Sequence, residues 1–178
     1  MEIRFLTVDD AGEYWRLRLE ALEGDPAAFS ASAEEHRSLS LEEVRKRLGS
    51  EAGDQFVVGA LQEGRLIGMA GFYREKNLKT RHKGHIWGVY VTPAGRGAGV
   101  GRRILQRVLN RLAEIEGLEQ VLLSVAATQT TAFRLYRALG FEVFGCEPRA
   151  LRIGERFIDE QYLVLHLKNG GPTEKPGL

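Results

Sequence analysis

Three glycines, each two residues from the next, mark the part of the chain best suited to hold an anion. Gly97, Gly99 and Gly101 lie in the segment HIWGVYVTPAGRGAGVGRRI, residues 85–104. Glycine has no Cβ, so the backbone here can turn tightly just before a helix begins. Free N–H groups and the positive end of the helix dipole favour a phosphate or pyrophosphate, and the flanking arginines add positive charge. The sequence therefore predicts a protein that holds a phosphorylated small molecule.

Two other classes of nucleotide-binding protein use glycine-rich loops, and both fit poorly. The run GAGVG lacks the full GxGxxG spacing of a dinucleotide-binding oxidoreductase, and the next apolar run, VLLSV at 121–125, ends without the acidic residue that would hold a ribose. A P-loop NTPase needs Gly-Lys-Ser/Thr, whereas arginines follow Gly101.

Apolar periodicity and turn residues predict the elements that position this loop. Strands are predicted over 2–7, 55–61, 65–73, 85–91, 121–125, 141–144 and 156–167. Helices are predicted from Asp9 or Asp10 to Pro26, around 41–48, from Val100 to Gly117, and up to Gly140. The order β, α, α, β, β, β, α, β, α, β, β predicts an α/β protein with a mixed sheet and helices on both faces.

Composition limits the classes of partner. The 178 residues suit one domain, and 25 Lys plus Arg nearly balance 24 Asp plus Glu, so no strong field favours nucleic acid or an anionic membrane. The stretch MEIRFLTVDD is acidic and lacks an apolar run of signal-peptide length, and no stretch of 18 apolar residues occurs, which predicts a soluble, cytoplasmic protein. The Gly- and Pro-rich stretch 168–178 is predicted to be a disordered tail.

Two motifs resemble the GNAT superfamily of N-acetyltransferases. The loop RGAGVG, preceded by Val91 and Pro93, is similar to the superfamily's Arg/Gln-x-x-Gly-x-Gly/Ala loop. The segment VAATQTTAFRLYRALGF, residues 125–141, is similar to its V-x-x-x-N-x-x-A-x-x-L-Y-x-x-x-G-F segment. The resemblance implies a single GNAT domain over 1–167, with a mostly antiparallel sheet of six to seven strands, about four helices, and a splay between the fourth and fifth strands.

The resemblance also implies acetyl-CoA as cosubstrate, with its pyrophosphate on the glycine loop and its pantetheine arm along the preceding strand. Gly88 in that strand can permit a bulge that splays it from the next strand, or make room for Trp87. Gln129 stands where the superfamily usually has an asparagine. The implied cofactor residues are Val89, Tyr90, Val91, Arg96, Gly97, Ala98, Gly99, Val100, Gly101, Arg102, Gln129 and Tyr136.

The implied reaction is direct transfer of an acetyl group to a primary amine in a ternary complex. Tyr136 occupies the position of the general acid, although a tyrosine that only packs is the alternative. A backbone N–H of Tyr90 or Val91 would stabilise the oxyanion, by analogy alone. The competing hypothesis is a non-catalytic module of the same fold that senses acetyl-CoA.

The general base is less well defined by the sequence. His85 lies eleven residues before Arg96, where histone-acetylating relatives place a glutamate, and it is either a candidate base or a strand histidine satisfied by the backbone. Glu34, Glu35, Asp159 and Glu160 are alternative bases, or bind a cationic acceptor, or are simply solvated. The acceptor is expected to be a small-molecule or peptide amine.

The remaining reactive residues are not expected to take part. Cys146 has no neighbouring His or Asp in the sequence to activate it, so we expect it to be a bystander. His36, His82 and His166 have no metal-ligand spacing, so no metal is predicted. Analogy with the superfamily makes a homodimer possible.

Overall fold

The computed structural model describes residues 1–49 and 53–167. The strands are β1 (Glu2–Phe5), β2 (Gln55–Gln62), β3 (Arg65–Arg74), β4 (Lys83–Val91), β5 (Gln120–Ala126), β6 (Glu142–Ile153) and β7 (Arg156–His166). The helices are α1 (Ala11–Gly24), α2 (Ala33–Arg37), α3 (Leu41–Leu48), α4 (Val100–Leu112) and α5 (Thr130–Ala138), and the short 3-10 turns are η1 (Val8–Asp10), η2 (Pro26–Ala28) and η3 (Pro93–Gly95). The tail predicted to be disordered, 168–178, lies outside the described residues.

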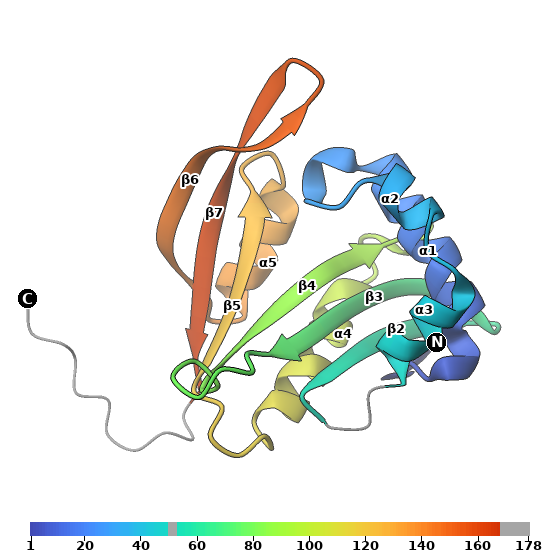
Figure 1. Ribbon diagram of the computed structural model, residues 1–178, viewed down its shortest axis with the longest axis horizontal. Helices are drawn as coiled ribbons and strands as arrows, with labels where there is room; N and C mark the ends of the chain where they lie inside the picture. Colours follow the sequence, from blue (N-terminus) through green and yellow to red (C-terminus); the bar gives the residue numbers. More distant parts are fainter. Residues whose placement is uncertain (50–52, 168–178) are drawn as a thin grey trace, which may run out of the picture.

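The strands form one seven-stranded sheet in the order β1-β2-β3-β4-β5-β7-β6 (Figure 1). Only the β4–β5 pair is parallel, and every other neighbouring pair is antiparallel. This arrangement confirms the predicted mixed, mostly antiparallel sheet. The hairpin between β2 and β3 turns at Glu63 and Gly64, which both have positive φ.

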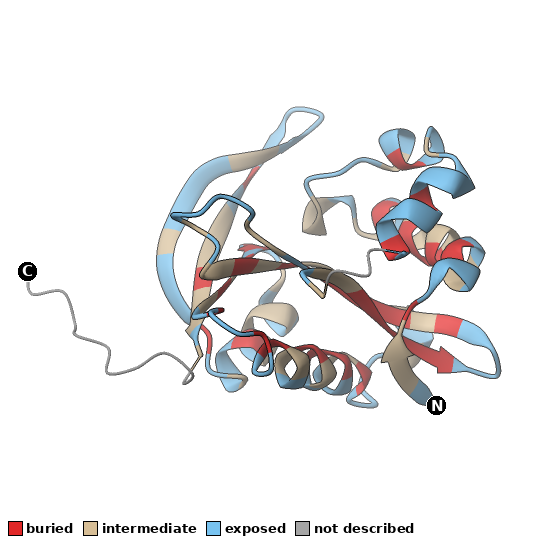
Figure 2. Cartoon of the chain, turned by 60° about the horizontal axis from the view of Figure 1, so that its bottom comes forward, coloured by how far each residue is buried: buried red, intermediate tan, exposed pale blue. Residues whose placement is uncertain are grey.

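Helices cover both faces of the sheet, as predicted, and each face has its own core. One core joins α4 and α5 to the sheet, and the apolar stripe of α4 is fully buried there at Ile104, Val108 and Leu112. Figure 2 shows the buried residues of α4 gathered along one side of the helix. The second core lies between the other face of the sheet and helices α1 and α3, where Leu17 and Val44 are fully buried.

The described part of the chain has five α-helices, one more than expected, and the unpredicted one is α2. It has five residues and one buried side chain, His36, so it is too short to show an apolar period. A capping box fixes its start, because Ser32 accepts from the N–H of Glu35 and the Glu35 carboxylate accepts from the N–H of Ser32. The Ser-x-x-Glu spacing was the signal in the sequence.

Strand β6 is three times as long as the four residues predicted. The prediction stopped at Phe144 because Gly145, Pro148 and several exposed polar residues interrupt the pattern of a strand. The structure accommodates them with register shifts on either side of Cys146, and Arg149 adopts a positive φ of 58°. No helix in the described ranges is long and apolar enough to cross a membrane.

Candidate active site

The two halves of the sheet separate between β4 and β5. These strands pair only at their first residues, from Lys83 opposite Gln120 to His85 opposite Leu122. Beyond His85 they diverge, and Figure 1 shows β5, β6 and β7 turning away from β4. The edge of β4 from Ile86 onward therefore has no partner strand on the β5 side among the described residues, and its backbone polar groups there are open to an extended ligand.

A bulge in β4 accompanies this separation. Met69 of β3 lies opposite Tyr90, while Gly71 lies opposite Trp87, so Gly88 and Val89 share the space opposite a single residue of β3. Gly88 has a φ of 63°, a conformation that favours glycine. The predicted bulge is therefore confirmed.

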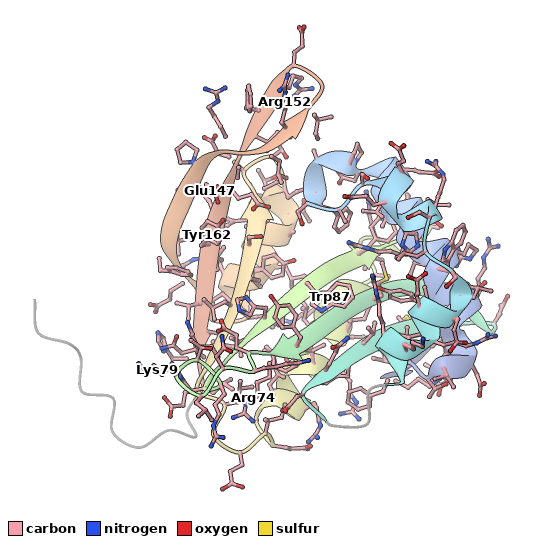
Figure 3. The ribbon with its side chains drawn as sticks, viewed as in Figure 1. Arg74, Lys79, Trp87, Glu147, Arg152 and Tyr162 are labelled. Carbon is pink, nitrogen blue, oxygen red and sulfur yellow. The ribbon has the colours of Figure 1, made fainter. Side chains whose placement is uncertain are left out.

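Gly88 does not make room for Trp87, which was the alternative. The Trp87 ring lies over Gly71 of β3, where any Cβ would collide with it. Figure 3 shows this ring over the middle of the sheet. The space beside Gly88 holds the guanidinium of Arg18 instead, since a Cβ on Gly88 would lie 3.3 Å from Arg18 Nη1.

A small cavity of about 70 Å³ lies in the gap between the two halves of the sheet. Most of its lining side chains are apolar, and they come from η2, β4, β5, α5 and the residues next to them. The lining residues are Ala28, Phe29, Ile86, Trp87, Gly88, Val89, Leu123, Ser124, Val125, Gln129, Ala132 and Tyr136.

The glycine loop forms the predicted turn at the start of α4. Gly97 and Gly99 have φ values of 79° and 73°, and a Cβ on either would meet no atom within 4 Å. The N–H groups from Gly97 to Arg102 donate to no acceptor in the described part of the chain, because the first bond of the helix runs from the N–H of Arg103 to the oxygen of Gly99. The loop therefore presents a row of free donors at a helix N-terminus, which suits a pyrophosphate.

The remaining predicted cofactor residues on β4 present backbone rather than reactive side chains. Val89 and Val91 pack against the α4 core, and the Tyr90 hydroxyl donates to Glu20 of α1 at 3.2 Å. The side chain of Arg96 folds back so that its Nε donates to the oxygen of Val91 at 3.1 Å. Arg102 is exposed at the end of the loop.

Tyr136 lies on the cavity wall, in the last turn of α5. It is only 5% exposed and its ring meets Phe141 edge to face, with centroids 6.1 Å apart. Burial raises the pKa of the Tyr136 phenol well above its ordinary value, so the hydroxyl keeps its proton at neutral pH. A protonated hydroxyl on a cavity wall can act as a general acid, and its raised pKa means that it gives up this proton only to a strongly basic leaving group.

Gln129 also lines the cavity, but its side chain has a partner within the protein. The Gln129 amide donates to both carboxylate oxygens of Asp25, at 3.0 and 2.9 Å. Asp25 directly precedes η2, so this pair connects the start of α5 to the segment that carries Ala28 and Phe29 over the cavity.

His85 lies just outside the cavity. Its Nε2 is 2.9 Å from Glu75 Oε1, and its ring stacks on Tyr73 with centroids 4.9 Å apart. It belongs to the last β4–β5 pair before the strands separate and is not among the lining residues. Its partner is a carboxylate rather than the backbone group that sequence reasoning offered as the alternative, and its role as base stays a prediction.

The four predicted acceptor carboxylates do not form one cluster with the cavity. Glu35 caps α2, Glu34 is exposed on the same helix, and Asp159 Oδ1 accepts from the N–H of Arg149 at 2.8 Å. Glu160 lies nearest the cavity wall, because Ser124 Oγ is 3.4 Å from Glu160 Oε1. Burial raises the pKa of the Glu160 carboxyl, which brings it closer to the range of a base that works near neutral pH.

Sequence reasoning missed Arg18 at this site. Arg18 is 9% exposed on α1, and its guanidinium lies 4.7 Å from the ring centroid of Phe29 and 5.9 Å from that of Trp87. The signal was its spacing, since Tyr14, Arg18 and Leu22 occupy one face of the helix at intervals of four residues and all are buried. A charged arginine in an otherwise apolar, buried stripe is costly unless it has a partner or a ligand.

Residues 1–49 and 53–167 contain no cluster of His, Cys, Asp or Glu that could hold a metal ion. Cys146 is exposed on β6, and it is absent from the wall of the cavity.

Comparison with known families supports these observations. The profile of the acetyltransferase (GNAT) family matches residues 16–141. Among curated proteins, the spermine/spermidine N(1)-acetyltransferase of Bacillus subtilis is 29% identical over 92 residues, which cover 49% of this chain and 60% of that protein. The chain spans only about a fifth to three fifths of the length of the curated relatives that it matches.

Solved structures share the fold. An acetyltransferase of the GNAT family from Streptococcus pneumoniae superposes with a TM-score of 0.83 at 22% identity, covering 93% of this chain and 98% of that one. A phosphinothricin acetyltransferase from Sinorhizobium meliloti, solved in complex with acetyl-CoA, has a TM-score of 0.80 at 23% identity, covering 97% and 93% of the two chains.

Proposed function

This chain belongs to the acetyltransferase (GNAT) family, and from that premise we propose that it transfers an acetyl group from acetyl-CoA to a primary amine of a small molecule or peptide. We place this activity in one domain spanning residues 1–167. The observation that carries the proposal is a pair of open backbone surfaces that follow one another along the chain. They are the unpaired edge of β4 and the row of free N–H groups from Gly97 to Arg102.

Acetyl-CoA fits these two surfaces. Its pyrophosphate needs several donors, and the loop offers free N–H groups, open space at Gly97 and Gly99, and the positive end of α4. Its pantetheine arm carries amides that can pair with the free backbone groups of β4 beyond Ile86, as an added strand would. The acetyltransferase from Sinorhizobium meliloti was solved with acetyl-CoA bound, which supports the same cosubstrate here.

The chemistry requires a proton donor for the leaving group. When bound, acetyl-CoA supplies an acetyl group whose C–S bond breaks as a C–N bond to the amine forms. Tyr136 donates its phenolic proton to the departing sulfur, and its buried position keeps that proton in place beforehand. A backbone N–H of β4, from Tyr90 or Val91, stabilises the negative charge that develops on the carbonyl oxygen.

The amine must also lose a proton, and we assign that step to Glu160 rather than His85. Glu160 reaches the cavity wall through Ser124, and its raised pKa favours proton uptake. His85 already has Glu75 as partner and Tyr73 over its ring. The curated Bacillus subtilis relative is named for polyamine acceptors, which supports an amine as the group acetylated.

Release of free thiol from acetyl-CoA in the presence of a panel of amines tests the proposal. The expected result is amine-dependent release that falls strongly in Tyr136→Phe, while acetyl-CoA still binds. Binding of acetyl-CoA without turnover of any amine would instead favour the sensing module. Failure to bind acetyl-CoA would contradict both functions.

A further inference from the structure

Arg18 is a buried charge that acetyl transfer, as described above, leaves unused. Its Nη1 is fully buried and has no hydrogen-bond partner in the described ranges of the chain. A guanidinium ion without an acceptor is expensive to bury, because it loses its hydration and gains nothing in return. Its two ring contacts compensate only part of that loss.

Arg18 lies directly behind the wall of the cavity, although it is not itself a lining residue. Three residues that line the cavity, Phe29, Trp87 and Gly88, are also those that surround Arg18. The bulge at Gly88 leaves the strand without a side chain at this point, which is why the arginine can approach the backbone so closely. The same cavity is bordered on its far side by Tyr136.

No carboxylate balances the charge of Arg18 within the described ranges. The titratable groups that act on it are Tyr14 of its own helix and Arg47 of α3, and His36 of α2 in turn feels the charge of both arginines. Desolvation is the main reason that the pKa of His36 is lowered, so its ring is neutral near pH 7. The surroundings of Arg18 are therefore neutral or positive, and they favour an anion from outside the protein.

We expect the anionic group that pairs with Arg18 to belong to the acceptor rather than to acetyl-CoA. The phosphates of acetyl-CoA already have a proposed site at the glycine loop, after the C-terminal end of β4, whereas Arg18 contacts residues that line the cavity where the acetyl group would meet the amine. A carboxylate matches the planar fork of donors that arginine presents.

We propose that Arg18 binds a carboxylate of the acceptor, so that the preferred substrate is an α-amino acid or a similar amine with a carboxylate close to its amino group. This rests on the proposed function, because it uses the same cavity. Glu160, on β7, receives the proton of the amino group, and Arg18, on α1, holds the carboxylate beside Phe29 and Trp87.

The experiment compares matched acceptors that differ only in the carboxylate. Thiol release from saturating acetyl-CoA is measured with the protein L-amino acids and with the corresponding amino acid amides. We expect the best amino acid to exceed its amide in kcat/KM by about ten- to hundredfold, the effect of one hydrogen-bonded ion pair. In Arg18→Met this ratio is expected to fall to about one, while the affinity for acetyl-CoA is unchanged.

Thermal unfolding separates ligand binding from a structural role. Methionine fills similar space without charge, so Arg18→Met is expected to leave the melting temperature of the free protein unchanged or to raise it. Arg107→Met is the matched control, since Arg107 of α4 also stacks on a ring, that of Phe5 at 4.4 Å, but on the opposite face of the sheet. This control is expected to keep the preference for the free amino acid.

Three results would overturn the assignment of the carboxylate. They are equal use of amides and amino acids by the natural protein, an unchanged preference in Arg18→Met, and acetylation of none of the amino acids although acetyl-CoA binds. A melting temperature that falls sharply in Arg18→Met but not in Arg107→Met would show a structural role instead. Failure of acetyl-CoA to bind would contradict the proposed function itself.

Discussion

The proposed cofactor surface and the proposed acceptor surface, called the backbone wall and the side-chain wall below, are built in different ways. On the side of the glycine loop, the polar groups belong to the backbone of one continuous segment, from Ile86 to Arg102. On the acceptor side, the side chains of Arg18 from α1, Phe29 from the segment after η2 and Trp87 from β4 meet, so β4 contributes backbone groups to one surface and a side chain to the other. The first wall offers donors that any molecule with a pyrophosphate and amides can use, and the second offers one charge in an apolar setting. This difference suits a site that takes one fixed cosubstrate and selects one acceptor.

The largest expected effect is on the backbone wall. In Gly99→Val, a β-branched residue must adopt a φ of 73° and project into the space beside the free N–H groups. We expect the affinity for acetyl-CoA to fall by at least about a hundredfold, or about 3 kcal/mol, as measured by calorimetry. Gly64→Val is the control, since Gly64 also has a positive φ and open space but lies in the β2–β3 turn. Equal loss of binding in both variants would argue against a special role for the loop.

The second effect concerns the chemical step, in which the acetyl group passes from the cosubstrate to the acceptor. Tyr136→Phe removes the proton donor and is expected to lower kcat by about a hundredfold with little change in the affinity for acetyl-CoA. Tyr14→Phe serves as the control because Tyr14 is also deeply buried, at 2% exposed, but is absent from the cavity wall. Single-turnover thiol release measures both. A fully active Tyr136→Phe would reduce Tyr136 to a packing residue.

The third effect is a change in pH dependence. A carboxylate base must be ionised, so activity is lost as the pH falls through the pKa of Glu160, which lies above its ordinary value. Glu160→Gln is expected to remove this acidic limb and to lower kcat/KM about tenfold or more. His85→Asn is expected to keep the limb. The opposite pattern in pH profiles of kcat/KM would assign the base to His85.

The smallest expected effect concerns the hydrogen bonds between the side chains of Gln129 and Asp25. Asp25→Ala and Gln129→Leu each remove the bond that joins the start of α5 to the segment before η2. A double-mutant cycle on acetyl-CoA binding is expected to give a coupling of about 1 kcal/mol. Additive losses would mean that Gln129 acts on the cofactor directly, as its position in the sequence predicts.

The backbone wall could be predicted from the sequence, because its geometry follows from local rules. Glycines at 97, 99 and 101 after a strand and before an apolar helix imply a tight turn with free donors, and the structure has that turn. The bulge at Gly88 was visible for the same reason. The sheet itself followed from alternating and helical apolar patterns, apart from the short helix α2 and the extension of β6 past Pro148.

The side-chain wall could not be predicted in the same way. The contact of Arg18 with Trp87 joins α1 to β4, and the bond of Gln129 to Asp25 spans more than a hundred residues. Such contacts depend on how layers pack, which no local spacing encodes. The acidic residues Glu34, Glu35 and Asp159 suggested a cationic acceptor. The carboxylates of Glu35 and Asp159, however, accept hydrogen bonds from the backbone N–H groups of Ser32 and Arg149. The sequence could show that these residues are charged, but not which of them reach the cavity.

Calorimetric titration of the protein with acetyl-CoA, with ATP and NADH as controls, shows whether the glycine loop and the free edge of β4 bind this cosubstrate. We expect saturable binding of acetyl-CoA in the micromolar range and no comparable binding of the other two. Absence of acetyl-CoA binding, or equal binding of ATP or NADH, would contradict the proposed function.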